Sequence, residues 1–181
     1  MSKASIREKN LCTTPVGTRV LSETKMFEVK TGRINIADPC HSMGSRCGHW
    51  RLPAMNGQWE CNVDISNEGE WGLRVASLQA WHTGRKPRGA VWGNLLGTVD
   101  IDTGTVCICD TGLYSSEVPA NDLLYQRIWL VVGDEDWGIF YNMGVASKTG
   151  VGDGCYDIYA KKTLGKITAV KILFIDTEDG I

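Results

Sequence analysis

The sequence predicts a mostly β protein: a single-domain β-sandwich or partly open barrel with at most one or two short helices. Short runs that alternate apolar and polar residues recur along the chain, and 21 glycines are spread between these runs as turn residues. The length of 181 residues suits one domain, and no internal repeat or low-complexity tract marks a second. We expect residues 1–20 to form a flexible N-terminal arm and residues 21–181 to form the β-rich domain.

The first half of the chain contains a predicted hairpin and the clearest strand. Residues 27–36 alternate on either side of Gly32, which predicts a hairpin. Asp38 follows with the parity of the apolar residues before it, so its carboxylate should point inward, where it needs a polar partner. Residues 59–66 alternate without interruption and predict a half-buried strand. Residues 71–81 lose the alternation midway, which predicts a bulged strand or a change into a helical turn.

The second half adds a second predicted hairpin and one helix. Thr103-Gly104 separates two alternating runs and predicts a tight hairpin turn between residues 98–102 and 105–109. One short helix is expected over residues 121–127, capped by Asn121, with a buried strand over residues 128–132 directly after it. Further strands are expected at 137–141, 156–160 and 167–175, and the last should be central because both of its faces are apolar.

Composition and charge argue against several classes of partner. A formal net charge of −2 gives no electrostatic footprint for nucleic acid, and no apolar run approaches the roughly 20 residues of a membrane helix. Neither nucleic acid nor a membrane is therefore an expected partner. Residues 1–10 lack the apolar stretch of a secretory signal. Seven cysteines, an odd number, indicate reduced thiols and a cytoplasmic location.

One short segment contains residue types that bind zinc. Cys40, Cys47 and His49 are candidate metal ligands, with Asp38 and His41 close in sequence. Their spacing matches none of the established zinc-finger or zinc-ribbon templates. The alternative is that the thiols pack as small hydrophobic side chains. Zinc is the one cofactor that the sequence suggests.

Other residues at strand ends and in loops could form a ligand pocket. The glycine-rich segment 150–154 could bring backbone N–H groups close to an anion, or it could be a tight turn. Trp50, Trp81 and Trp92 lie in loop-rich stretches and could line a pocket, with core packing as the alternative. Aspartates at strand ends could converge on one rim and hold a divalent cation, or could form turns. The candidate ligand-binding residues are Asp38, Cys40, Trp81, Asp102, Asp110, Asp153 and Tyr156.

Several short strings, taken together, resemble a family of uncharacterised phage and bacterial proteins. The strings are Lys30-Thr31-Gly32, Ile36-Ala37-Asp38-Pro39-Cys40, Asp102-Thr103-Gly104 with Asp110, Gly152-Asp153-Gly154-Cys155-Tyr156 and the run 169–176. In that family a strand ends in Asp-Pro-Cys, and a Gly-x-Gly-Asp-Gly-x-Tyr turn precedes the last strand. The resemblance runs from about residue 26 to 176. It implies a compact β-rich fold and no particular activity, and the chain departs from the pattern at His41 and Cys155.

An enzyme is not the favoured class, because no Ser-His-Asp or Cys-His arrangement stands out in the sequence. The leading hypothesis is a non-enzymatic, phage-type accessory protein that sequesters a small nucleotide-like ligand or binds a host protein. One alternative is a metal-dependent hydrolase that uses carboxylates with Cys40, Cys47 or His49. Another is an immunity-type protein that masks a protein partner through an exposed apolar patch. Homo-oligomerisation is compatible with each.

Overall fold

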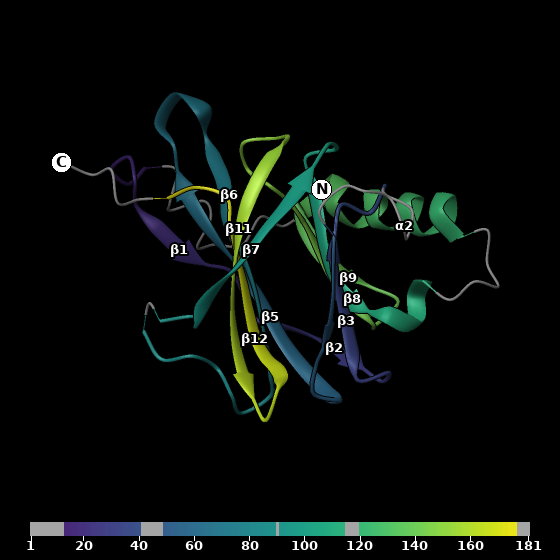
Figure 1. Cartoon of the computed structure of the whole chain (residues 1–181). Helices are drawn as coiled ribbons and strands as arrows, with labels where there is room; N and C mark the ends of the chain where they lie inside the picture. Colours follow the sequence, from purple (N-terminus) through teal and green to yellow (C-terminus); the bar gives the residue numbers. More distant parts are fainter. Residues whose placement is uncertain (1–12, 41–48, 90, 115–119, 177–181) are drawn as a thin grey trace.

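Two antiparallel sheets make up most of the described part of the protein, and the one α-helix of that part lies on the outer side of the smaller sheet (Figure 1). The computed structural model describes residues 13–40, 49–89, 91–114 and 120–176. The prediction of a mostly β, single-domain sandwich with few helices is confirmed. In the described residues no helix is long and apolar enough to cross a membrane.

The larger sheet has seven strands in the order β1-β5-β6-β12-β11-β7, with β2 also paired to β5. Its strands are β1 (Arg19–Leu21), β2 (Lys25–Val29), β5 (Gly57–Asn67), β6 (Leu73–His82), β7 (Asn94–Ile101), β11 (Gly154–Thr163) and β12 (Lys166–Leu173). A 3-10 turn, Gly69–Trp71, joins β5 to β6. β1 begins at Arg19, inside the segment 1–20 that was expected to form an arm.

The smaller sheet has five strands in the order β4-β3-β8-β10-β9. They are β4 (Trp50–Pro53), β3 (Arg33–Ala37), β8 (Thr105–Asp110), β10 (Gly144–Lys148) and β9 (Trp137–Phe140). A 3-10 turn, Thr111–Tyr114, follows β8, and helix α2 (Ala120–Glu135) packs against β9 and β10. The helix therefore covers the face of this sheet that points away from the larger one (Figure 1).

The main hydrophobic core lies between the sheets, and a smaller one lies under the helix. Phe27, Trp59 and Ile36 are completely buried in the main core. The predicted strand over residues 59–66 is confirmed within β5, and its apolar side chains point into this core. The bulge expected within residues 71–81 is also confirmed, because the register between β5 and β6 shifts so that Ala76 has no direct partner.

Both predicted hairpins are wrong. β2 pairs with β5 in the larger sheet, while β3 pairs with β4 and β8 in the smaller one. Likewise β7 pairs with β11, whereas β8 pairs with β3 and β10. The turns at Gly32 and Gly104 have positive φ angles, +71° and +62°, but each carries the chain from one sheet to the other. A turn residue fixes the local reversal of the chain and leaves the choice of strand partner open.

The strand predicted over residues 128–132 is also wrong. These residues belong to α2, a single helix of 16 residues, and Asn121 lies inside that helix instead of capping it. Leu124, Ile128 and Val132 recur at intervals of four and are buried against the smaller sheet. A continuous apolar run suits a buried strand and a buried helix equally, and here the helical spacing decides.

Candidate functional site

Asp38, the inward carboxylate, holds the turn between β7 and β8. It is 1% exposed. Its Oδ2 accepts hydrogen bonds from the backbone N–H groups of Asp102 and Thr103, at 2.8 and 2.9 Å, and from the hydroxyl of Thr103 at 2.9 Å. Its Oδ1 accepts the backbone N–H of Cys40 at 2.8 Å. The polar partner that the sequence demanded is thus a neighbouring turn, and these bonds occupy both carboxylate oxygens.

Asp110 does the same for the turn between β2 and β3. The side chain is fully buried, and its Oδ2 accepts the backbone N–H groups of Lys30 and Thr31, at 2.6 and 2.8 Å, and the Thr31 hydroxyl at 3.0 Å. Its Oδ1 accepts the N–H of Gly112 at 2.7 Å. Each aspartate therefore ends one of two adjacent strands, β3 and β8, and holds the turn that precedes the other.

The two aspartates share a short repeat that the sequence analysis missed. Residues 31–38 and 103–110 both run Thr-Gly, then alternating residues with Ile or Val facing the core, then Asp. The strand register places Asp110 opposite Ile34, so Asp38 lies roughly 13 Å further along the pair. The two carboxylates are therefore not side by side, and a ligand pocket that includes both stays a prediction.

The other polar candidates gather at the Asp38 end. The turn at Gly104 adjoins the glycine-rich turn at Gly152, where a Cβ on Gly104 would lie 3.5 Å from the Gly152 Cα. Tyr156 is buried and its hydroxyl donates to the Gly152 carbonyl at 2.6 Å, so it stabilises the turn. Asp102 and Asp153 are exposed. The glycine-rich segment 150–154 is thus a tight turn that contacts the turn at Gly104 and accepts a hydrogen bond from Tyr156.

The tryptophan candidates are packed. Trp81 is 1% exposed, donates its Nε1–H to Glu60 at 2.9 Å and meets the Trp92 ring edge-on at 6.1 Å. Trp50 lies over Gly97, where a Cβ would come within 2.5 Å of the indole, and donates to the Thr98 carbonyl at 2.7 Å. The structure therefore places Trp81 and Trp50 in packing roles.

The predicted zinc site is only partly described. Cys40 is exposed and His49 is half-buried, while Cys47 lies outside the described residues. Among the described residues, no three His, Cys, Asp or Glu side chains come together as a metal ion would require. Zinc binding by Cys40, Cys47 and His49 stays a prediction.

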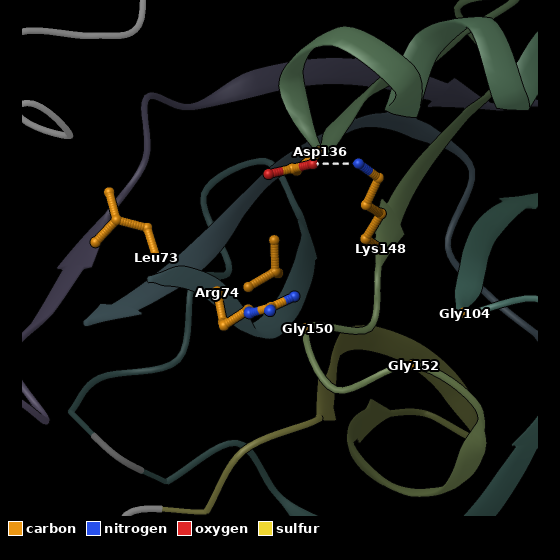
Figure 2. Close-up of a pocket in the computed structure, with 8 residues that line it drawn as sticks. Leu73, Arg74, Gly104, Asp136, Lys148, Gly150 and Gly152 are labelled. Atoms are coloured by element: carbon orange, nitrogen blue, oxygen red, sulfur yellow. Dashed lines mark hydrogen bonds and ion pairs between the residues drawn. The ribbon is translucent and has the colours of Figure 1, made fainter. Parts of the chain in front are cut away.

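A small open pocket lies between the glycine turns and the C-terminal end of α2 (Figure 2). Its volume is about 190 Å³. Lys148 from β10 pairs with Asp136 on one side, and Arg74 from β6 lies on another, beside Gly150 (Figure 2). Pockets for drug-sized ligands and cofactors usually have volumes of roughly 300–1,000 Å³. This pocket is too small to enclose a nucleotide.

Two of the buried thiols have raised pKa values. Burial raises the pKa of the Cys61 thiol to about 12. The Cys109 pKa is also raised, by its hydrogen bond with Cys107 and by burial, and burial raises the pKa of the nearby Tyr114 hydroxyl. Since a thiolate is the reactive form of cysteine, these groups stay protonated and unreactive near neutral pH.

The outer face of α2 carries several exposed apolar side chains. Leu123, Trp129 and Leu130 are 58%, 53% and 66% exposed. Apolar residues occur on the outer side of the helix as well as on the side that faces the sheet. Trp129 packs on Tyr125 with ring centroids 6.2 Å apart, and the Arg127 guanidinium lies 5.9 Å from the centre of the Tyr141 ring. We call Leu123, Arg127, Trp129, Leu130 and Tyr141 the α2 patch.

No protein-family model, curated protein or solved structure matches the chain. The candidate surfaces are therefore argued from the geometry alone.

Replacing Asp38 with alanine should destabilise the fold by about 3 kcal/mol or more, because four buried hydrogen bonds to one charged group are lost. Asp38→Asn should cost less, since the amide oxygen still accepts. Urea unfolding measures both. The exposed Asp153→Ala is the control and should change the free energy of unfolding by less than about 0.5 kcal/mol. Equal losses for Asp38→Ala and Asp153→Ala would contradict the role assigned to Asp38.

Alkylation should separate the cysteines by burial. We expect iodoacetamide at mildly alkaline pH to modify Cys40 and Cys155, which are exposed, in the native protein. Cys61, Cys107 and Cys109 should react only after denaturation, because burial hides them and the pKa values of Cys61 and Cys109 are raised. Peptide mass spectrometry gives the extent at each site. Fast native alkylation of Cys61 would show that the larger sheet opens readily at β5.

Proposed function

We propose that this chain is a non-enzymatic binding protein whose partner is another protein, and that the partner docks on the α2 patch. The carrying observation is the exposure of Leu123, Trp129 and Leu130 on one helix. Single exposed apolar residues are common on protein surfaces, whereas a contiguous group with an aromatic residue is typical of the centre of a protein interface.

The arrangement of the patch supports a helix-in-groove mode of binding. Leu123 and Leu130 are seven residues apart, so they lie on the same side of the helix, and Trp129 lies about 100° further round it. Trp is among the residues that contribute most to binding when an interface buries them. The ring of Tyr125 supports Trp129 from the same helix. A partner with an apolar groove would cover the two leucines and the indole together.

The charge of the α2 patch indicates which charge the partner's groove should carry. Residues 123–130 contain no acidic side chain, and Arg127 is their one cation. The exposed guanidinium lies against Tyr141 at the border of the patch. Complementary charge favours a groove with an acidic rim at this position. The partner we propose is therefore a protein with an apolar groove bordered by Asp or Glu.

We favour a protein partner over a small nucleotide-like ligand, because the pocket that the described residues form beside Lys148 has a volume of about 190 Å³, below the usual range for ligand pockets. The resemblance to phage and bacterial proteins supports a partner from a bacterial host, and the odd number of cysteines supports an encounter in the cytoplasm. No observation on the described residues favours a metal-dependent hydrolase. The proposed partner is a host protein, as in one form of the leading hypothesis, and it docks on an exposed apolar patch, as in the immunity-type alternative.

Leu130→Asp should abolish partner binding, because it puts a carboxylate at the centre of the patch. A photo-crosslinking amino acid at Gln126, an exposed position between the leucines, reports the partner in bacterial lysate. We expect one crosslinked protein with the otherwise unchanged chain and none with Leu130→Asp. Val151→Asp, at an apolar position of similar exposure elsewhere, is the matched control and should retain the crosslink.

Two outcomes would contradict the proposal. Crosslinking that is unchanged by Leu130→Asp, or absent altogether, would remove the α2 patch as the docking surface. A crosslink to a second copy of the chain, with a dimer in size-exclusion chromatography with light scattering that Leu130→Asp converts to a monomer, would show that the patch serves self-association. Urea unfolding of each variant should stay within about 0.5 kcal/mol of the parent, since position 130 faces solvent.

A further inference from the structure

Two segments rich in Lys and Arg lie together at one end of the larger sheet. The first is the connection from β6 to β7, residues 83–93, and the second is the hairpin turn between β11 and β12, residues 160–167. They are neighbours because β12 pairs with β6, with Ala169 opposite Trp81, and Figure 1 shows both at the lower end of the sheet. Neither segment contains an acidic residue. The overall charge of −2 hides this asymmetry.

Six cations define this surface, which we call the basic end: Arg85, Lys86, Arg88, Lys161, Lys162 and Lys166. All six are exposed. The ion pairs of the described residues involve other side chains, so none of the six is neutralised by a described carboxylate. A group of six unpaired cations over two adjacent loops produces a local positive potential that attracts polyanions.

The first loop is held in place by its own apolar residues. Trp92 is buried against Trp81, and the Lys86 ammonium lies 4.4 Å above the centre of the Trp81 ring. At the end of the loop Gly93 approaches the Ala160 carbonyl so closely that a Cβ would come within 2.1 Å of its oxygen. Packing therefore holds the end of the loop, at Trp92 and Gly93, against Trp81 and β11.

Leu164, at the tip of the hairpin, is in an unfavourable position. It is 98% exposed and has φ +51°, followed by Gly165 at φ +77°. Two positive φ angles in a two-residue hairpin turn are the type I′ geometry, for which Asn-Gly is the preferred sequence. A leucine there is strained and fully hydrated. Leu164 therefore adds an exposed apolar side chain between the exposed Lys162 and Lys166.

We infer that the basic end binds an anionic lipid surface. Lys162 and Lys166 flank Leu164 on the same turn, so the cations would contact lipid phosphates while the leucine enters the boundary between headgroups and acyl chains. Nucleic acid fits less well, because the tryptophans of this end are buried and provide no stacking surface for bases. Phosphodiester contacts also leave the exposed leucine without a role. The inference is independent of the α2 patch, which lies on the outer side of the other sheet (Figure 1).

Vesicle co-sedimentation tests this binding directly. The purified full chain is mixed with vesicles of phosphatidylcholine alone or with added phosphatidylserine, at low and at high salt. We expect it to sediment with the phosphatidylserine vesicles at low salt and to remain soluble with phosphatidylcholine, because attraction to anionic lipid is electrostatic and screened by salt. Equal binding to both vesicle types, or to neither, overturns the inference.

Variants separate the leucine from the charges. Leu164→Asn should weaken vesicle binding about fivefold or more, because it removes the apolar side chain that enters the bilayer. The midpoint of urea unfolding should stay the same or rise, because Asn-Gly is the favoured sequence for this turn. Lys162→Glu should weaken it at least fivefold, at the usual contribution of one cation near an anionic surface. Arg74→Glu is the matched control, since position 74 lies about 26 Å away at the other end of β6. Equal weakening by the control overturns the assignment to the basic end.

A duplex oligonucleotide distinguishes the two polyanions. Fluorescence anisotropy at the same salt gives its affinity for the parent chain and for Leu164→Asn. Weak duplex binding, with the same affinity for the parent chain and for Leu164→Asn, supports the lipid assignment. Duplex binding tighter than vesicle binding, lowered by Lys162→Glu and unaffected by Leu164→Asn, overturns it in favour of nucleic-acid phosphate.

Discussion

Two buried aspartates fix how the sheets are joined. Asp38 and Asp110 end neighbouring strands, and each accepts two backbone N–H groups and a threonine hydroxyl from the turn before the other strand. At those turns the chain leaves one sheet and enters the other, so the N–H groups have no ladder partner. A buried N–H without an acceptor costs free energy, and the carboxylates remove that cost. The sandwich therefore depends on charge as well as on its apolar core.

These turns also show which features of the fold could be predicted from the sequence and which could not. Glycine at positions 32 and 104 correctly predicted breaks between strands, and the parity of Asp38 correctly predicted an inward carboxylate. The wrong inference was that strands joined by a tight turn pair with each other. The repeated Thr-Gly and Asp pattern over 31–38 and 103–110 was present in the sequence. Its meaning depends on two segments being adjacent in space, which the spacing of residues in one segment does not encode.

The helix illustrates a different limit, and it led to the α2 patch. The apolar run 128–132 fits a buried strand or a buried helix, and local pattern does not separate them. A helix this apolar buries Leu124, Ile128 and Val132 and still leaves Leu130 and Trp129 in water. The feature that misled the secondary-structure prediction is thus the feature that makes the surface distinctive. Of the predicted site residues, Asp38, Asp110, Tyr156 and Trp81 are buried and make hydrogen bonds within the fold, because strand-end carboxylates and aromatic residues serve turns and cores as readily as ligands.

Net charge and composition describe a chain, whereas binding depends on where charge lies. A sum of −2 suggested no polyanionic partner, yet six cations meet at one end because β6 and β12 are paired. The apolar α2 patch lies on the outer side of the smaller sheet, and the basic end lies at a terminus of the larger one (Figure 1). Residues that serve only the fold have a structural reason for their identity, as Asp38 does. Among the described residues Leu164 and Leu130 remain exposed, and the lipid contact proposed for the first and the protein contact proposed for the second would cover them.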